Sequence, residues 1–161
     1  MAVFQERLDK AKQNIKIADH MLSVTYPLLK DSKLLLAIVE NIFLSYTNSI
    51  AALLYYEREL KKIPPFTDSF ESKFNMFRER CVLKYNIEKS YLMEIHDVWD
   101  IIIEHKKSPV EFKRRDSFVI CSESYKIKTI TVNNIKDYLN KAKVFIGDID
   151  NIVGKDEGLS R

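Results

Sequence analysis

The chain has 161 residues and carries 26 Lys and Arg against 23 Asp and Glu, a formal net charge of +3. This length favours one domain, whose core is large enough to need neither disulfides nor a structural metal. Only 3 Gly and 4 Pro are present, which argues against a β-rich fold with many tight turns and against a disordered chain.

The first predicted element is a helix over residues 2–29. Apolar or small residues recur along it at three- and four-residue steps, which gives one face a heptad character. These residues are Leu8, Ala11, Ile15, Ala18, Leu22, Thr25 and Leu29. Pro27 lies inside the pattern, so it should kink the helix or end it near Tyr26.

A second helix should start at the cap Asp31-Ser32 and reach about Lys62, before two consecutive prolines. In residues 34–56, 17 of 23 residues are apolar, which is close to the length of a membrane span. Polar residues interrupt this stretch, however, and three of them share one face of the helix: Asn41, Ser45 and Asn48. A helix buried on most sides of a bundle explains the pattern better, so we expect no membrane contact.

Two shorter helices are predicted next. Asp68 with Glu71 resembles a capping box for a third helix that ends near Tyr85. Asn86 should cap a fourth helix, which Ser108-Pro109 stops. Their apolar faces contain Phe70, Phe74, Phe77 and Cys81 in the third helix, and Ile87, Tyr91, Ile95, Val98 and Ile102 in the fourth.

Residues 117–132 change character, because two short β-branched and aromatic runs flank a polar Ser-Glu-Ser. This pattern predicts a small β-hairpin. Asn133 and Asn134 then start a last helix, which Gly154 should end. The sequence therefore predicts an all-α bundle of about five helices with a small β-hairpin insert near residues 117–132. It forms a single domain over residues 1–154 with a frayed tail at 155–161.

The positive charge of the chain is concentrated between His105 and Lys128. This window of 24 residues holds seven Lys and Arg against three Asp and Glu, so its charge is 7 − 3 = +4 and that of the remaining chain is about −1. Localised positive charge attracts RNA or another polyanion. The predicted nucleic-acid-binding residues are Lys106, Lys107, Lys113, Arg114, Arg115, Lys126 and Lys128, with Tyr125 or Phe112 stacking on bases.

A purely structural interpretation explains the same residues without a ligand. Lys106 and Lys107 would complement the C-terminal dipole of the fourth helix. Lys126 and Lys128 would be solvent-facing strand residues. They would alternate with Tyr125 and Ile127, which would face inward. The segment after Ser108-Pro109 would be a turn, with Val110 and Phe112 anchoring it in the core. The sequence leaves both interpretations open.

The sequence favours no enzymatic chemistry. It contains neither a Gly-rich phosphate loop nor a nucleophile elbow. His96 and Asp100 stand at i, i+4, the spacing of two metal ligands, but nothing near them completes a set, and we expect a surface hydrogen bond instead. Ser108 near His105 lacks an oriented base and an oxyanion site, so it is interpreted as a turn residue. We predict no catalytic residue and no metal site.

Cys81 and Cys121 form no CxxC and no Cys/His spacing. Residues 1–16 are charged and amphipathic and lack the apolar stretch of a secretory signal. We therefore expect reduced thiols, a cytoplasmic location and no cofactor.

The long apolar helix within residues 35–57, with Glu40 and Asn41 embedded in it, is followed by a break and a Phe-rich helix. This arrangement, over residues 31–105, resembles the HEPN superfamily of dimeric helical bundles, which are often RNA-cleaving toxins or partners of nucleotidyltransferases. The nuclease motif of that family is Arg, four to six residues, then His. No arginine of this chain has a His at that distance: Arg78 and Arg80 do not, and Arg114 and Arg115 precede no histidine. The resemblance therefore implies a non-catalytic relative.

These observations lead to three hypotheses. The first is a non-enzymatic helical module that binds RNA or another polyanion through the basic segment. The second is a structural or adaptor protein that homodimerises or docks a protein partner, through the seam of the first helix and the polar stripe of the second. The third is an HEPN-like ribonuclease with non-standard residues, such as His105 with Arg114.

Overall fold

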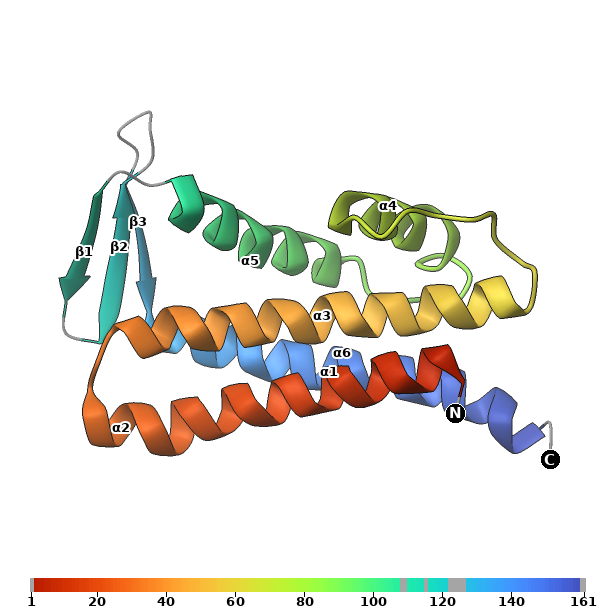
Figure 1. Ribbon diagram of the computed structural model, residues 1–161, viewed down its shortest axis with the longest axis horizontal. Coiled ribbons are helices and arrows are strands. Elements are labelled where there is room, and N and C mark those ends of the chain that lie inside the picture. The colour runs from red at the N-terminus through yellow and green to blue at the C-terminus, as the bar shows by residue number, and fades with distance from the viewer. Residues whose placement is uncertain (1, 108–109, 115, 122–126, 160–161) are drawn as a thin grey trace.

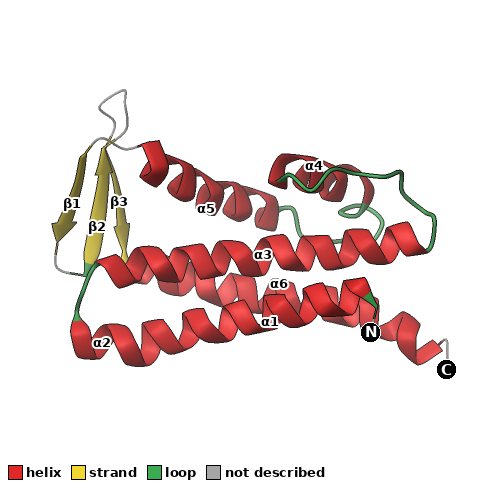
Figure 2. Cartoon of the chain, in the orientation of Figure 1, coloured by secondary structure: helices red, strands yellow, loops and turns green. Residues whose placement is uncertain are grey.

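The computed structural model describes residues 2–107, 110–114, 116–121 and 127–159, with side chains placed for residues 2–107, 116–121 and 127–154. Over these residues it contains five helices of at least 11 residues and one three-stranded sheet (Figures 1 and 2). The helices are α1 (Val3–His20), α3 (Lys33–Glu59), α4 (Phe70–Arg80), α5 (Ser90–Lys107) and α6 (Val132–Leu159). The strands are β1 (Val110–Arg114), β2 (Ser117–Cys121) and β3 (Ile127–Thr131). The predicted helical bundle with a small β insert is confirmed.

The central element is α3, which packs against α1, α4, α5 and α6 (Figure 1). Its buried side chains include Ile38, Tyr46 and Leu53, which lie within the apolar stretch that resembled a membrane span. Among the described residues, α3 is the one helix that could cross a membrane by length and composition, and half of its most apolar window is buried inside the molecule. Its apolar surface is thus used in contacts with four neighbouring helices.

The first helix reaches Leu29, as its predicted range of residues 2–29 required, and does not end at Tyr26. After α1 the chain forms a π-helical turn, η1 (Met21–Thr25), and then α2 (Tyr26–Leu29). In the π turn the Tyr26 N–H donates to the Met21 carbonyl, five residues back. Proline lacks an N–H, and its ring crowds the carbonyl four residues earlier. The wider turn immediately before it lets the helix proceed.

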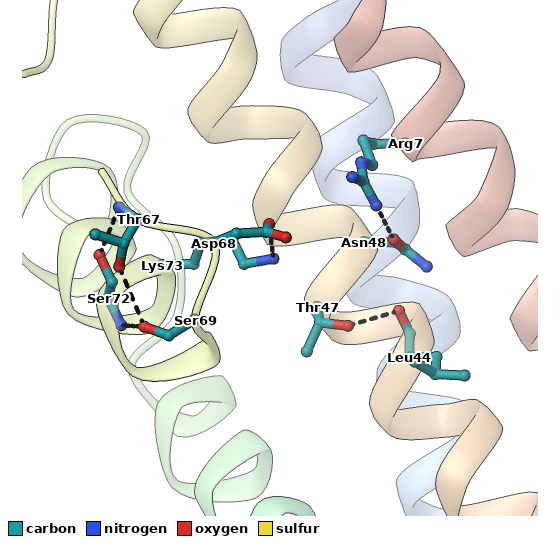
Figure 3. Close-up of polar contacts among 9 residues, drawn as sticks. All are labelled: Arg7, Leu44, Thr47, Asn48, Thr67, Asp68, Ser69, Ser72 and Lys73. Atoms are coloured by element: carbon teal, nitrogen blue, oxygen red, sulfur yellow. Dashed lines mark hydrogen bonds and ion pairs between the residues drawn. The ribbon is translucent and has the colours of Figure 1, made fainter. Parts of the chain in front are cut away.

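The start of α4 lies one residue later than the predicted cap. Ser69 is the N-cap, and its Oγ accepts a hydrogen bond from the Ser72 N–H at 3.2 Å (Figure 3). Asp68 instead forms an ion pair with Lys73 at 3.2 Å. The helix ends at Arg80 rather than near Tyr85, because the chain turns there.

Two further helix boundaries differ from their predictions. Asn86 does not cap α5: it adopts a left-handed conformation with φ 53°, and the helix begins at Ser90. At the start of α6 the capping residue is Thr131, whose Oγ1 accepts from the Asn134 N–H at 3.1 Å. Gly154 does not end α6, which continues to Leu159.

The sheet has the order β1-β2-β3, so β1 and β3 are its edges. Both pairings are antiparallel, and β2 with β3 forms the predicted hairpin. Strand β1 was not predicted, since the chain after Pro109 was expected to turn. The sheet joins the core through side chains of β2 and β3: Phe118, Ile120 and Ile130.

The register corrects the predicted alternation in β3. Lys128 pairs with Ile120, and directly paired residues lie on the same face of a sheet. Lys128 therefore shares the core-facing side of β3 with Ile130 and is partly buried, whereas Ile127 is 70% exposed. The assignment of Lys128 as solvent-facing and Ile127 as inward is wrong. Alternation along a strand shows that neighbouring residues lie on opposite faces, but it does not show which face meets the core.

Candidate polyanion-binding end of the bundle

The sheet lies at one end of the molecule, here called the sheet end (Figure 1). Lys106 and Lys107 are exposed in the last turn of α5, which leads into the sheet. Lys113 and Arg114 lie on the edge strand β1, and Lys128 lies on the edge strand β3. The remaining members of the predicted site, Arg115 and Lys126, lie outside the described residues, as do Ser108 and Tyr125. The part of the basic segment that is described thus belongs to one end of the fold.

Three further lysines, which the sequence reasoning missed, come from elements that reach the same end. Lys30 follows α2, Lys33 starts α3, and Lys136 lies near the start of α6. All three are exposed. Figure 1 shows the α2–α3 junction and the start of α6 beside the sheet. Only the topology brings these residues together, so no local sequence signal could have found them.

Asp116 organises the charges where the first helix meets the sheet. The Tyr26 hydroxyl donates to Asp116 Oδ1 at 2.7 Å, and Lys30 Nζ lies 3.5 Å from the same oxygen. Burial and the bond to Asp116 raise the pKa of Tyr26 to about 12, so its phenol stays protonated and donates. The Asp116 carbonyl also accepts from the Val132 N–H at 3.1 Å, which ties the β1–β2 turn to the start of α6.

A cleft of about 520 Å³ opens beside this arrangement. It lies between the end of the first helix, the β1–β2 turn and the junction of β3 with α6. Its lining combines apolar, hydroxyl, amide and charged side chains: Leu22, Tyr26, Pro27, Lys30, Asp116, Ser117, Thr131, Val132, Asn133 and Lys136. Two of the additional lysines therefore line one cavity. We call it the sheet-end cleft.

Two other polar pairs each contain a buried carboxylate. The Tyr46 hydroxyl donates to Glu94 Oε2 at 2.5 Å, and burial is the main cause that raises the pKa of both groups. Lys84 Nζ lies 2.8 Å and 3.0 Å from the two carboxylate oxygens of Glu57, whose residue is only 1% exposed. Both carboxylates thus have partners that offset the cost of burying them. We assign these pairs to stability rather than to a reaction.

His96 and Asp100 form the expected surface contact, with Nδ1 and Oδ2 3.3 Å apart. Asp97 brings a third ligand atom, and the three lie within 4.8 Å of one another. His96 and Asp97 are adjacent in α5, Asp100 lies one turn later, and none of the three is buried. Exposed acidic groups often cluster without a metal, so the geometry matches a solvated helix face as well as a cation site.

The features that suggested a homodimer make contacts within the chain. The seam of α1 is buried against α3 and α6. Asn48 Oδ1 accepts from Arg7 at 3.4 Å (Figure 3). The Asn48 amide also donates to Asn14 Oδ1 at 2.9 Å. The Ser45 hydroxyl donates to the Ile42 carbonyl at 2.6 Å. Asn48 therefore joins α3 to α1, the Ser45 bond lies within α3, and a homodimer stays a prediction.

Comparison of the chain with protein-family models, with curated proteins and with solved structures finds no match in any of the three. The function is therefore argued from the residues and their arrangement alone.

Proposed function

We propose that this protein is a non-enzymatic binding module that holds RNA against its sheet end. One observation carries the proposal: separate elements of the fold direct basic positions to the same end. Lys106 and Lys107 close α5, Lys113 and Arg114 lie on β1, and the partly buried Lys128 lies on β3. The resemblance to HEPN bundles is in keeping with RNA as the partner, and it stays a prediction.

The physical basis is the release of counterions. RNA binds cations along its phosphates, and each Lys or Arg that replaces one of them returns an ion to solution. Lys106 and Lys107 are both exposed on one helical turn, and the next element along the chain, the edge strand β1, carries Lys113 and Arg114. Lys30, Lys33 and Lys136 add charge at the same end. Several cations within one end of a small domain raise the local concentration of a polyanion.

The test is a comparison of two variants that lose the same charge. The first, Lys106→Gln/Lys107→Gln/Lys113→Gln, alters the sheet end. The control, Lys61→Gln/Lys62→Gln/Arg80→Gln, removes three exposed cations: two that follow the C-terminal end of α3 and one that is the last residue of α4. The end of α3 lies opposite to the sheet (Figure 1). Binding of a short fluorescein-labelled single-stranded RNA is measured by fluorescence anisotropy, and folding by circular dichroism.

We expect the sheet-end variant to lose at least about tenfold in affinity while it stays folded, and the control to retain wild-type binding. Equal losses in both variants would show that RNA responds to net charge alone and would reject the assignment of the site. No binding by the wild-type protein would reject the function itself.

The adaptor function is favoured by a different observation. Ile17, Val24 and Leu28 are 41%, 44% and 79% exposed and follow one another at steps of seven and four residues in the first helix. Val24 and Leu28 lie one helical turn apart, and exposed apolar residues at this spacing form a patch that a helical partner can cover. A wild-type protein that binds no RNA but sediments as a dimer, with Val24→Glu restoring the monomer, would establish this alternative.

A further inference from the structure

We infer that the sheet-end cleft binds a small phosphorylated molecule of about the size of a mononucleotide. This goes beyond RNA binding, because the cleft is a separate concave site with its own lining. Its volume of about 520 Å³ falls within the usual range of small-molecule sites, roughly 300–1,000 Å³. A cavity of this size holds a nucleoside or sugar together with one phosphate.

The cleft exists because the first helix continues past Pro27. The π turn η1 lets the helix continue as α2, so that Tyr26 and Lys30 reach the sheet. Lys30 then ends the helix in a left-handed conformation with φ 52°. On the facing side, the hydrogen bond from the Val132 N–H to the Asp116 carbonyl fixes the start of α6 against the β1–β2 turn. Both walls are therefore held by backbone interactions.

The charge of the cleft selects an anion. Lys30 and Lys136 contribute two ammonium groups from different elements, and Asp116 contributes one carboxylate, so the lining carries 2 − 1 = +1. Asp116 holds Lys30 at the rim through their 3.5 Å contact. A lysine ammonium is a compact charge on a flexible stem and serves as a common phosphate ligand. Two of them lining one cavity suit a dianionic phosphate monoester.

The rest of the lining suits an organic group attached to that phosphate. Leu22, Pro27 and Val132 provide apolar surface on both sides of the cleft. Asn133 is exposed and offers both an amide donor and an amide acceptor, which match the edge of a base or the hydroxyls of a sugar. The lining is mostly polar, with three apolar residues, and this suits a charged and hydroxylated ligand rather than an apolar one.

The probe is AMP, with adenosine and inorganic phosphate as separate titrations followed by ¹H–¹⁵N correlation spectra of the full chain. We expect AMP to shift the amides of residues 26–30, 116–117 and 131–136 and to bind more tightly than inorganic phosphate, with no response to adenosine. Lys30→Gln and Lys136→Gln should each lower the affinity for AMP by about tenfold. Lys33→Gln is the matched control, since Lys33 is exposed nearby but does not line the cleft.

Three results would overturn the inference. The first is that AMP does not shift the named amides. The second is that AMP binds no more tightly than inorganic phosphate. The third is that Lys33→Gln weakens AMP binding as much as the two cleft variants do. Because the amides of the cleft are read directly, a failure of RNA binding leaves this test intact. RNA binding by the Lys30→Gln/Lys136→Gln protein that falls only by the loss expected for two removed charges, while AMP no longer binds, would show that the two sites are separate.

Discussion

The buried hydrogen bond between Tyr46 and Glu94 offers a quantitative test of the packing at the centre of the bundle. Tyr46 is fully buried on α3, and Glu94 of α5 is 7% exposed. Tyr46→Phe removes only the hydroxyl, because the ring keeps its contact with Phe145, whose centroid lies 5.2 Å away. The variant therefore isolates one hydrogen bond with little change in packing.

The expected loss follows from the charge of the acceptor. A hydrogen bond to an ionised group contributes about 1.5–3 kcal/mol net to the free energy of unfolding. In a chain of this size each kcal/mol corresponds to about 2–4 °C, so the melting temperature of Tyr46→Phe should fall by about 3–12 °C. The assay is thermal and urea unfolding followed by circular dichroism at about pH 8, where Glu94 is ionised more fully.

The pH dependence gives a second, independent readout. Burial raises the pKa of Glu94 above its ordinary value of 4.5, while the bond from Tyr46 lowers it. The folded state thus binds the proton more tightly than the unfolded chain does. The stability that this proton gives the folded state is complete below the ordinary pKa of the carboxyl group. It is lost as the pH rises through the pKa that Glu94 has in the folded protein. Glu94→Gln removes the titration but keeps an oxygen that accepts from Tyr46, so this stability loss should disappear.

Tyr85→Phe is the matched control, because the Tyr85 ring lies only partly buried in the turn after α4. We expect it to change the free energy of unfolding by less than about 0.5 kcal/mol. The expected contribution of the hydrogen bond would be refuted if Tyr46→Phe lost as little free energy of unfolding as Tyr85→Phe. It would also be refuted if Glu94→Gln retained the wild-type pH dependence.

Three other results are expected. Lys84→Met leaves the buried Glu57 carboxylate without its ammonium partner and should cost about 3 kcal/mol in urea unfolding, whereas an unchanged midpoint would contradict the pairing. Cys81 is fully buried with its pKa raised to about 12, so iodoacetamide should label the partly exposed Cys121 first in the native protein and both thiols after unfolding. Incubation with labelled RNA should give no cleavage; cleavage that His105→Ala abolishes would instead support the ribonuclease hypothesis.

The sequence predicted the helices well because apolar periodicity reflects the burial of one helix face. The seam from Leu8 to Leu22 and the faces of α4 and α5 are buried as expected. Helix boundaries were less predictable, because adjacent polar residues compete for the same cap. Asp68 and Ser69 are both suitable, and the local backbone selects Ser69. At Pro27 a π turn accommodates the ring, a solution that periodicity does not show.

The sheet was predicted only in part. Strand β1 has five residues and follows a proline, so its short alternation of apolar and charged residues resembled a turn. Its pairing with β2 stabilises it, and pairing is a tertiary property. In β3 the alternation was correctly seen, but its inward face was not. The packing of Ile130 in the core decides it and makes Lys128 partly buried.

The candidate site was likewise predicted only in part. The contiguous basic segment was visible in the sequence, because its charge is local. The sheet-end cleft was not, since Lys30 and Lys136 stand far apart in the chain and meet only when α2 and α6 reach the same end. Charge runs are a property of the sequence, whereas a concave site is a property of the fold.

The most direct test of RNA binding at the sheet end is the slope of log affinity against log salt for single-stranded RNA, between about 50 and 200 mM. Each phosphate contact contributes about −0.7 to this slope, so replacing Lys106, Lys107 and Lys113 should make it shallower by up to about 2. The control triple variant should keep the wild-type slope. Affinity that does not depend on salt, or equal slopes for the wild-type protein and both variants, would contradict the proposed function.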